Sequence, residues 1–299
     1  MPRRFLLLLL FFLVPADLAG LAAPSAAASP VITRTLHHGP LTVITRHKDP
    51  EADDGLDYPP RLRILDGKRE VAAFVFTDDI GPLHVYIAEM DPDNGRPEVV
   101  AESYSGGAHC CTTVMVFSAP PKGSAPWRRV NLGSFDGAGG IPPVDIDGDG
   151  LSEMPLKDNS FLYQFGCYAC SYAPPRILAV RGGKVVDLTR RRAMRPYLRK
   201  AEKRALARIR ESMAENEGPA ENGLLAGYVA LKMLLGEGPQ AWRFMLKHYR
   251  RDAPMILCPV PDKDGGNCLV PQIRLPFPAA LAIFLADGGY GKFALYPEE

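Results

Sequence analysis

The chain has 299 residues, of which 46% are hydrophobic, and its 35 lysines and arginines are almost balanced by 34 aspartates and glutamates. This composition excludes a disordered chain and a strongly basic protein that would be drawn to nucleic acid by its overall charge. The length is sufficient for a hydrophobic core divided between two domains.

The N-terminus predicts a signal peptide over residues 1–28. Arg3-Arg4 precedes an apolar run from Phe5 to Val14, and Ala26-Ala27-Ala28 provides an A-x-A cleavage site. A membrane anchor is the alternative, but Pro15 interrupts the run before the roughly 20 apolar residues that a spanning helix needs. We therefore expect a periplasmic or secreted protein with no transmembrane segment after cleavage and with no nucleic-acid partner.

The next part of the chain, residues 29–189, predicts an antiparallel β domain that is either propeller-blade-like or sandwich-like. Short runs rich in β-branched and aromatic residues alternate there with Gly, Pro, Asp and Asn. Phe161, Tyr163 and Phe165 alternate with other residues, which is typical of the buried face of a strand. A hairpin turn is expected at residues 181–184. The clearest strand candidates are residues 41–45, 71–76, 84–88, 113–117 and 176–180.

Residues 190–299 predict a small helical region, so that the fold class is α+β. Apolar residues recur at helical spacing over 198–213, 224–235 and 242–249, and a short helix is expected over 278–286. Ten basic residues and one acid lie between Arg190 and Arg210. We interpret this run as a solvated helix face rather than a surface for phosphate-rich lipid or nucleic acid.

The most informative segment of the β domain is the acidic loop from Asp145 to Glu153. Its acidic side chains stand at loop positions one, three, five and nine, with glycines at positions four and six. Ca²⁺ takes six to eight oxygen ligands, and odd positions of a tight loop bring side-chain oxygens together. A bound cation would also offset the repulsion between crowded carboxylates. The loop is no complete EF-hand, because its twelfth position is Leu156 instead of a glutamate.

The pattern D-x-D-G-D-G-x-x-[DE] of this loop resembles the calcium hairpin of FG-GAP and VCBS repeats, which occur in integrin-type propellers and in many exported bacterial proteins. The match covers about nine residues strongly. The resemblance implies a structural Ca²⁺ held by four carboxylates and one backbone carbonyl, namely those of Asp145, Asp147, Asp149, Glu153 and Leu151.

A weaker echo of the acidic loop lies earlier in the chain, from Asp91 to Glu98. It is one residue shorter and has fewer carboxylates, and its Gly95 lies 55 residues before Gly150. Such a spacing is compatible with a repeated β unit. We expect the echo to keep the turn without the metal.

Six cysteines in an exported chain predict disulfide bonds. Cys258 and Cys268 bracket a polar loop and are expected to pair. Cys110 and Cys111 are adjacent, and because a bond between neighbours would strain the peptide, their expected partners are Cys167 and Cys170. The connectivity among these four stays open at this stage.

His109 precedes the adjacent cysteines in the segment Ser105-Gly106-Gly107-Ala108-His109-Cys110-Cys111. It resembles a G-G-A-H-C-C signature of exported bacterial proteins, to which we attach no activity. Two alternatives to disulfides are a zinc site with Cys167 and Cys170 and a reactive thiol activated by His109.

Taken alone, the sequence favours an exported, calcium-stabilised binding or structural protein with a partner in the envelope or outside the cell. A periplasmic hydrolase with a metal-assisted or carboxylate site is the first alternative. The second is an inhibitor of an envelope-directed enzyme, suggested by the loop at 258–268. An enzyme is less favoured because no nucleophile, base and oxyanion group are recognisable together.

Overall fold

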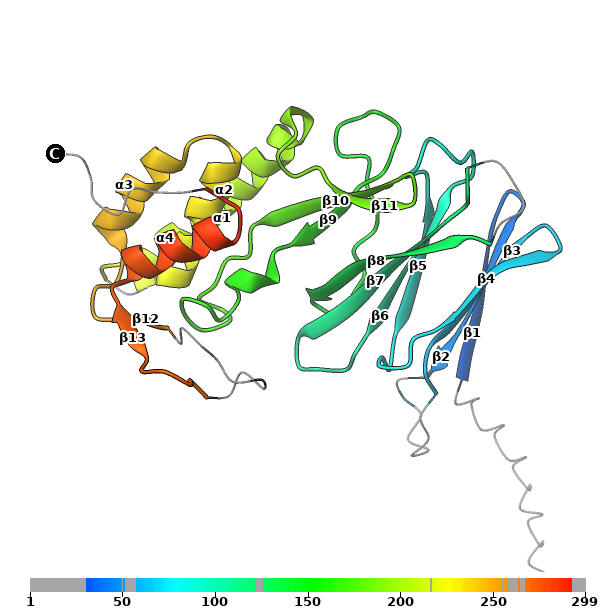
Figure 1. Ribbon diagram of the computed structural model, residues 1–299, viewed down its shortest axis with the longest axis horizontal. Helices are drawn as coiled ribbons and strands as arrows, with labels where there is room; N and C mark the ends of the chain where they lie inside the picture. The colour runs from blue at the N-terminus through cyan, green and yellow to red at the C-terminus, as the bar shows by residue number, and fades with distance from the viewer. Residues whose placement is uncertain are drawn as a thin grey trace, which may run out of the picture.

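The computed structural model describes residues 31–49, 51, 58–121, 126–215, 217–253, 255–257, 263 and 267–291. The predicted signal peptide, residues 1–28, and Cys258 lie outside these ranges. Antiparallel sheets come first along the chain and the α-helices come last (Figure 1), which confirms the α+β class. Among the described residues no helix combines the length and apolar character required to cross a membrane.

Two four-stranded antiparallel sheets pack face to face at the N-terminal end of the molecule. Every strand in them pairs with its neighbour in sequence. Their shared core contains Val43 and Leu62 from the first sheet with Val99 and Phe117 from the second, all at most 2% exposed. The packing is therefore sandwich-like. The first sheet consists of β1 (Val31–His38), β2 (Leu41–Lys48), β3 (Arg61–Asp66) and β4 (Arg69–Val75), and the second of β5 (Leu83–Ala88), β6 (Glu98–Tyr104), β7 (Cys110–Ser118) and β8 (Arg128–Asp136).

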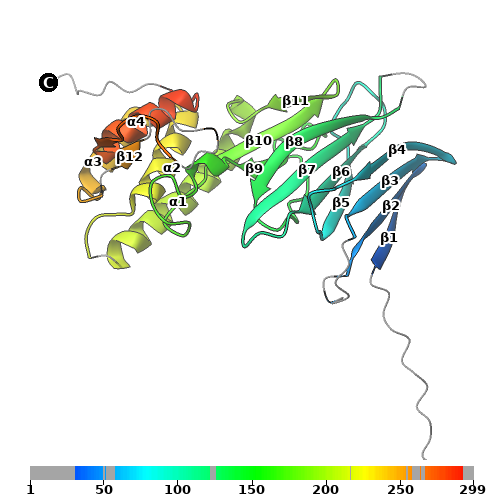
Figure 2. The same cartoon turned by 60° about the horizontal axis from the view of Figure 1, so that its bottom comes forward.

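A third sheet separates the sandwich from the helices (Figures 1 and 2). Its central strand has apolar side chains on both faces. Leu178 and Val180 join the core formed with the second sheet, whereas Ile177 and Ala179 join the core formed with the helices. The expected hairpin at 181–184 connects two of its strands. The strand order is β11-β10-β9, with β9 at Met154–Lys157, β10 at Pro175–Arg181 and β11 at Lys184–Asp187.

The helices carry the apolar stripes expected from the sequence. In the first helix, Leu198, Ala201, Ala205 and Ile209 are at most 1% exposed and face the second helix and the third sheet. The α-helices are α1 (Arg195–Glu215), α2 (Asn222–Leu234), α3 (Gly238–His248) and α4 (Phe277–Asp287), and short elements are η1 (Asn159–Phe161), η2 (Arg192–Met194), β12 (Met255–Leu257) and β13 (Ile273–Leu275).

The segment with three alternating aromatic residues is not the strand that its pattern predicts. Phe161 ends the short helix η1, and Phe165 follows in a turn. Both are buried, but Tyr163 between them is 58% exposed and has a backbone φ of +60°. A left-handed residue reverses the direction of the chain, so that the phenol ring points away from the core that holds its two neighbours.

Candidate functional site

The acidic loop brings three of its carboxylates together. Asp145, Asp147 and Asp149 are exposed, and each offers a carboxylate oxygen within 4.8 Å of the oxygens offered by the other two. Two oxygens bound to one Ca²⁺ at about 2.3–2.6 Å lie no more than about 5 Å apart. A single ion can therefore contact all three side chains.

Backbone hydrogen bonds hold this loop in its turn. Asp145 accepts the N–H of Gly148 at 2.7 Å on one carboxylate oxygen and the N–H of Gly150 at 3.0 Å on the other. Both glycines have positive φ, +82° and +88°, which other residues adopt only with strain. The glycine spacing of the sequence therefore serves the turn, and the turn places the carboxylates.

Glu153, predicted as the fourth carboxylate ligand, is not part of this group of three. It is fully buried, with Oε2 accepting the N–H of Ile146 at 3.0 Å and Oε1 lying 3.5 Å from the Arg181 guanidinium. Burial raises the pKa of Glu153 and the charges of Asp147 and Asp149 raise it further, against the effects of the Ile146 N–H and Arg181. Its position anchors the end of the loop, and its role as a ligand stays a prediction, as does that of the Leu151 carbonyl.

The acidic loop joins the second sheet to the third. Val144 and Glu153 form a short antiparallel bridge that closes the loop. The N–H of Ser152 donates to the Glu89 carbonyl at 2.7 Å, just beyond β5. Arg181, at the end of β10, donates to the Met90 carbonyl and faces Glu153. The loop is thus hydrogen-bonded to segments that adjoin or belong to both sheets.

The echo loop, residues 91–98, uses its acids differently. Glu98 is fully buried and accepts from four donors: the N–H groups of Met90 and Asp91, Asn94 Nδ2 and the Ser118 hydroxyl. Burial raises the pKa of Glu98, while these donors act in the opposite direction. Asp91 is only 1% exposed and accepts the N–H of Gly183 at 2.9 Å. Protein donors therefore occupy the positions around its two buried carboxylates.

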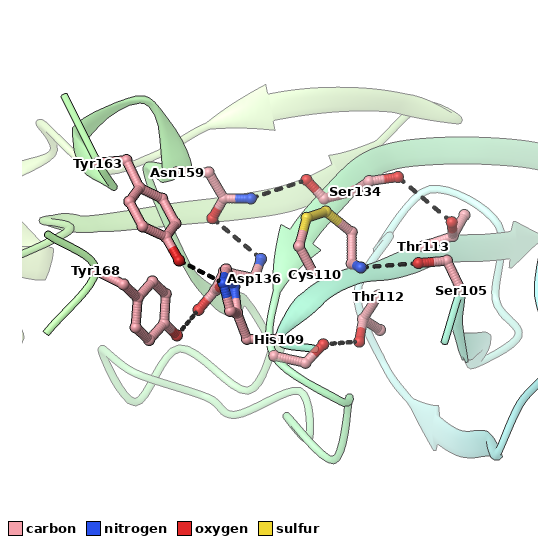
Figure 3. Close-up of a disulfide and its surroundings, with 12 residues drawn as sticks. Ser105, His109, Cys110, Thr112, Thr113, Ser134, Asp136, Asn159, Tyr163 and Tyr168 are labelled. Atoms are coloured by element: carbon pink, nitrogen blue, oxygen red, sulfur yellow. Dashed lines mark hydrogen bonds and ion pairs between the residues drawn. A yellow bond between two sulfur atoms is a disulfide. The ribbon is translucent and has the colours of Figure 1, made fainter. Parts of the chain in front are cut away.

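A second constellation surrounds His109 (Figure 3). Its Nδ1 lies 2.9 Å from Asp136 Oδ1, and its Nε2 lies 2.9 Å from the Tyr163 hydroxyl. Tyr168 stacks on the imidazole at 4.1 Å and donates its hydroxyl to Asp136 Oδ2 at 2.5 Å. That hydrogen bond is the main reason why the pKa of Tyr168 rises to about 12, so that the phenol stays protonated near neutral pH.

No pattern in the sequence indicates that these residues meet. Asp136 and Tyr163 lie 27 and 54 positions after His109, on β8 and in the turn after η1. The glycines of the signature have a steric role. A Cβ on Gly107 would lie 2.0 Å from the Cys110 carbonyl oxygen, and one on Gly106 would lie 2.5 Å from Ile80 Cδ1.

The disulfide pairing expected between the two cysteine pairs is wrong. Cys110 is bonded to Cys111 across a cis peptide that places the two Cα atoms 3.0 Å apart, and Cys167 is bonded to Cys170. None of the described cysteines is free. The alternative zinc site therefore has no thiolate ligands among them, and the alternative of a reactive thiol has no free thiol. Cys268 is disulfide-bonded, and its predicted partner Cys258 lies outside the described residues.

The His109 constellation reaches the surface, where the His109 side chain is 33% exposed and Tyr163 is 58% exposed. Asp136 orients the imidazole through Nδ1, and Nε2 is hydrogen-bonded to the Tyr163 hydroxyl. Both Asp136 oxygens are already engaged, and the neighbouring cysteines are bonded. This chemistry suits polar recognition at a fixed surface better than nucleophilic attack.

Comparison with known proteins finds two relatives and one family. The family described as the sll0997 C-terminal domain matches residues 202–289. The chain is 32% identical over 263 residues to the "Probable thylakoid lumen protein sll0997" of Synechocystis sp., an alignment that covers 87% of this chain and 76% of the relative. It is 35% identical over 208 residues to the "Uncharacterized protein y4bJ" of Sinorhizobium fredii, covering 69% of this chain and 32% of that protein. No solved structure matches the chain.

Proposed function

We propose that the chain, which belongs to the family of the probable thylakoid lumen protein sll0997, is an exported binding or structural protein stabilised by calcium. The relative's name places that protein in a lumen, and the signal peptide predicted for residues 1–28 independently favours export to the periplasm or beyond. The observation that carries the calcium part of the proposal is the approach of three aspartate oxygens to within 4.8 Å of one another.

The proposed ion is bound in the manner of an FG-GAP or VCBS hairpin. Asp145, Asp147 and Asp149 supply exposed carboxylate oxygens, and hard oxygen ligands of this kind select Ca²⁺ over softer metals. The Leu151 carbonyl and Glu153 complete the proposed set. Water fills the remaining positions, as is usual for calcium sites at a protein surface.

The role proposed for the ion is structural. Calcium sites of extracellular modules have dissociation constants on the order of 10⁻⁴–10⁻³ M, so millimolar calcium adds roughly 0.4–1.4 kcal/mol to the free energy of unfolding. The loop contacts Glu89 and Arg181, which belong to the segments following β5 and ending β10. Stiffening the loop therefore supports the junction between the second and third sheets.

The test is a thermal unfolding experiment with millimolar Ca²⁺ or with EGTA. We expect a higher melting temperature with calcium in the wild type and no calcium shift in Asp147→Ala. The matched control is Asp93→Ala, at the corresponding position of the echo loop, where Asp93 is exposed and the calcium shift should persist. An equal melting temperature with calcium and EGTA in the wild type would refute the proposed ion.

The hydrolase alternative receives less support than binding. Asp136 is held by His109 and Tyr168, and both cysteine pairs nearby are bonded, so the acid and the thiols that a catalytic site would use are already engaged. The inhibitor alternative rests on residues 258–268, most of which lie outside the described residues. Pull-down from envelope extract with and without calcium addresses the partner directly.

A further inference from the structure

The outer face of the first sheet is open. One face of β1–β4 packs on the second sheet through Val43, Leu62 and their neighbours. The opposite face lies at the end of the molecule, where no described element covers it (Figure 2). It carries several arginines, which belong to neither the acidic loop nor the His109 constellation.

Two rows of side chains cross this outer face in register. One row consists of Arg46 on β2, Arg61 on β3 and Val75 on β4. The next row consists of Ile44, Arg63 and Ala73 on the same three strands. The three arginines are exposed, and Val75, the last residue of the edge strand β4, is 39% exposed.

These two rows line a hollow of about 470 Å³. Ligand pockets for small molecules typically have about 300–1,000 Å³ and combine apolar walls with a few placed polar groups. Here the apolar wall is formed by Ile44, Ala73 and Val75, and the polar groups are guanidinium groups.

The charges in the hollow are incompletely neutralised. Arg63 pairs with Glu70 at 2.6 Å, but neither Arg46 nor Arg61 has an acidic partner among the described residues. The two stand directly opposite on antiparallel strands, and like charges in such a cross-strand pair destabilise a sheet. An anion between them would remove this repulsion and could accept hydrogen bonds from both guanidinium groups.

We propose that this hollow binds a small amphiphilic carboxylate. The carboxylate group contacts Arg46 and Arg61, and the apolar body lies along Ile44, Ala73 and Val75. Two arginines paired across neighbouring strands suit a planar carboxylate, and the apolar wall favours a ligand that also has an apolar body. The proposal is independent of the calcium loop, which lies on the other side of the second sheet.

The test is calorimetric titration of the full chain with octanoate, acetate and 1-octanol. We expect octanoate to bind and both acetate and 1-octanol to bind at least about tenfold more weakly, because each offers only half of the ligand. Arg61→Gln should weaken octanoate binding by about tenfold. The octanoate affinity of Arg61→Lys should lie between those of the wild type and Arg61→Gln. Arg69→Gln is the control, because Arg69 is exposed on the same sheet and lies outside the hollow.

Each contrary outcome identifies a different error. Equal binding of 1-octanol would show a merely apolar surface, and equal binding of acetate would show a simple anion site. Unchanged octanoate binding in Arg61→Gln would place the ligand elsewhere. Binding to vesicles of anionic lipid without any binding of octanoate would replace the proposal by a membrane surface. Far-ultraviolet circular dichroism of each variant establishes that it is folded before it is titrated.

Discussion

The loops at 91–98 and 145–153 end alike and differ in the middle. Each ends in a fully buried glutamate that accepts a backbone N–H from the residues near the start of its loop, Asp91 in one and Ile146 in the other. The first loop surrounds its glutamate with four protein donors. The second leaves three aspartates exposed. A similar turn can therefore be stabilised from within by hydrogen bonds or, as we propose, from outside by a cation.

The largest effect is expected from Glu98→Ala. The substitution leaves the N–H groups of Met90 and Asp91 without their buried acceptor, and should lower the free energy of unfolding by about 3 kcal/mol. Urea unfolding measures the loss, which should be the same in calcium and in EGTA. Exposed Asp93→Ala in the same loop should change the stability by less than about 0.5 kcal/mol. A loss restored by calcium would contradict the view that this loop is self-sufficient.

Arg181→Met tests the residue that links Met90, just before the echo loop, to Glu153 at the end of the acidic loop. The variant loses hydrogen bonds to the Met90 and Val180 carbonyls and the positive charge beside Glu153, and should be less stable by about 2 kcal/mol in urea unfolding. The control on the same strand is Arg176→Met, whose exposed pair with Asp187 at 3.5 Å should contribute less than about 1 kcal/mol. Equal losses in the two variants would mean that Arg181 contributes no more than a surface ion pair.

Gly95→Ala and Gly150→Ala compare the backbone of the two turns. The φ angles are +67° and +88°, and a Cβ at either position meets no atom within 4 Å. The loss should thus arise from backbone strain alone, about 1 kcal/mol for each variant by chemical denaturation in EGTA. Because asparagine tolerates a left-handed backbone, Gly95→Asn should lose less than Gly95→Ala. Similar stability of all three variants and the wild type would contradict the strained turn.

The smallest effect is a pH dependence that calcium should reduce. Burial and the charges of Asp147 and Asp149 raise the pKa of Glu153, so between its unfolded and folded pKa values the native state binds more protons. Its contribution to stability therefore falls as pH rises through the folded pKa. A bound cation offsets the repulsion from the two aspartates and should flatten this slope.

The measurement is the difference in urea midpoint between wild type and Glu153→Gln at about pH 5 and about pH 7, with calcium and with EGTA. The difference should vary with pH in EGTA and vary less with calcium. The same difference in urea midpoint, measured between wild type and Glu98→Gln, should be equal with calcium and with EGTA. A pH dependence of Glu153 that calcium leaves unchanged would place the ion, if bound, away from this carboxylate.

Local pattern was a reliable guide where a structure depends on neighbours in sequence. The hairpin at 181–184 and the helical stripe from Leu198 to Ile209 formed as predicted, because turn residues and helical spacing act within a few positions. The three aspartates of the acidic loop lie together for the same reason. The turn that holds them is built from hydrogen bonds between residues no more than five positions apart in sequence.

The same reasoning failed where the outcome depended on backbone geometry or distant contacts. Tyr163 fits an alternating strand pattern, but its positive φ turns it outward toward His109. Adjacent Cys110 and Cys111 were expected to find distant partners, because a bond between neighbours would strain the peptide, but they are bonded to each other. Asp136 reaches His109 only because β7 and β8 are paired, and no spacing rule reports that pairing.

The two-sided burial of β10 limits how the protein can be shortened. Ile177 and Ala179 are covered by the helices, while Leu178 and Val180 are covered by the second sheet. A fragment that ends just after Leu188 would expose the apolar, helix-facing side of this strand to solvent, together with Phe161 and Leu188. Such a fragment should self-associate when expressed alone, so soluble expression of the β-rich half requires polar replacements on that side or retention of α1 and α2.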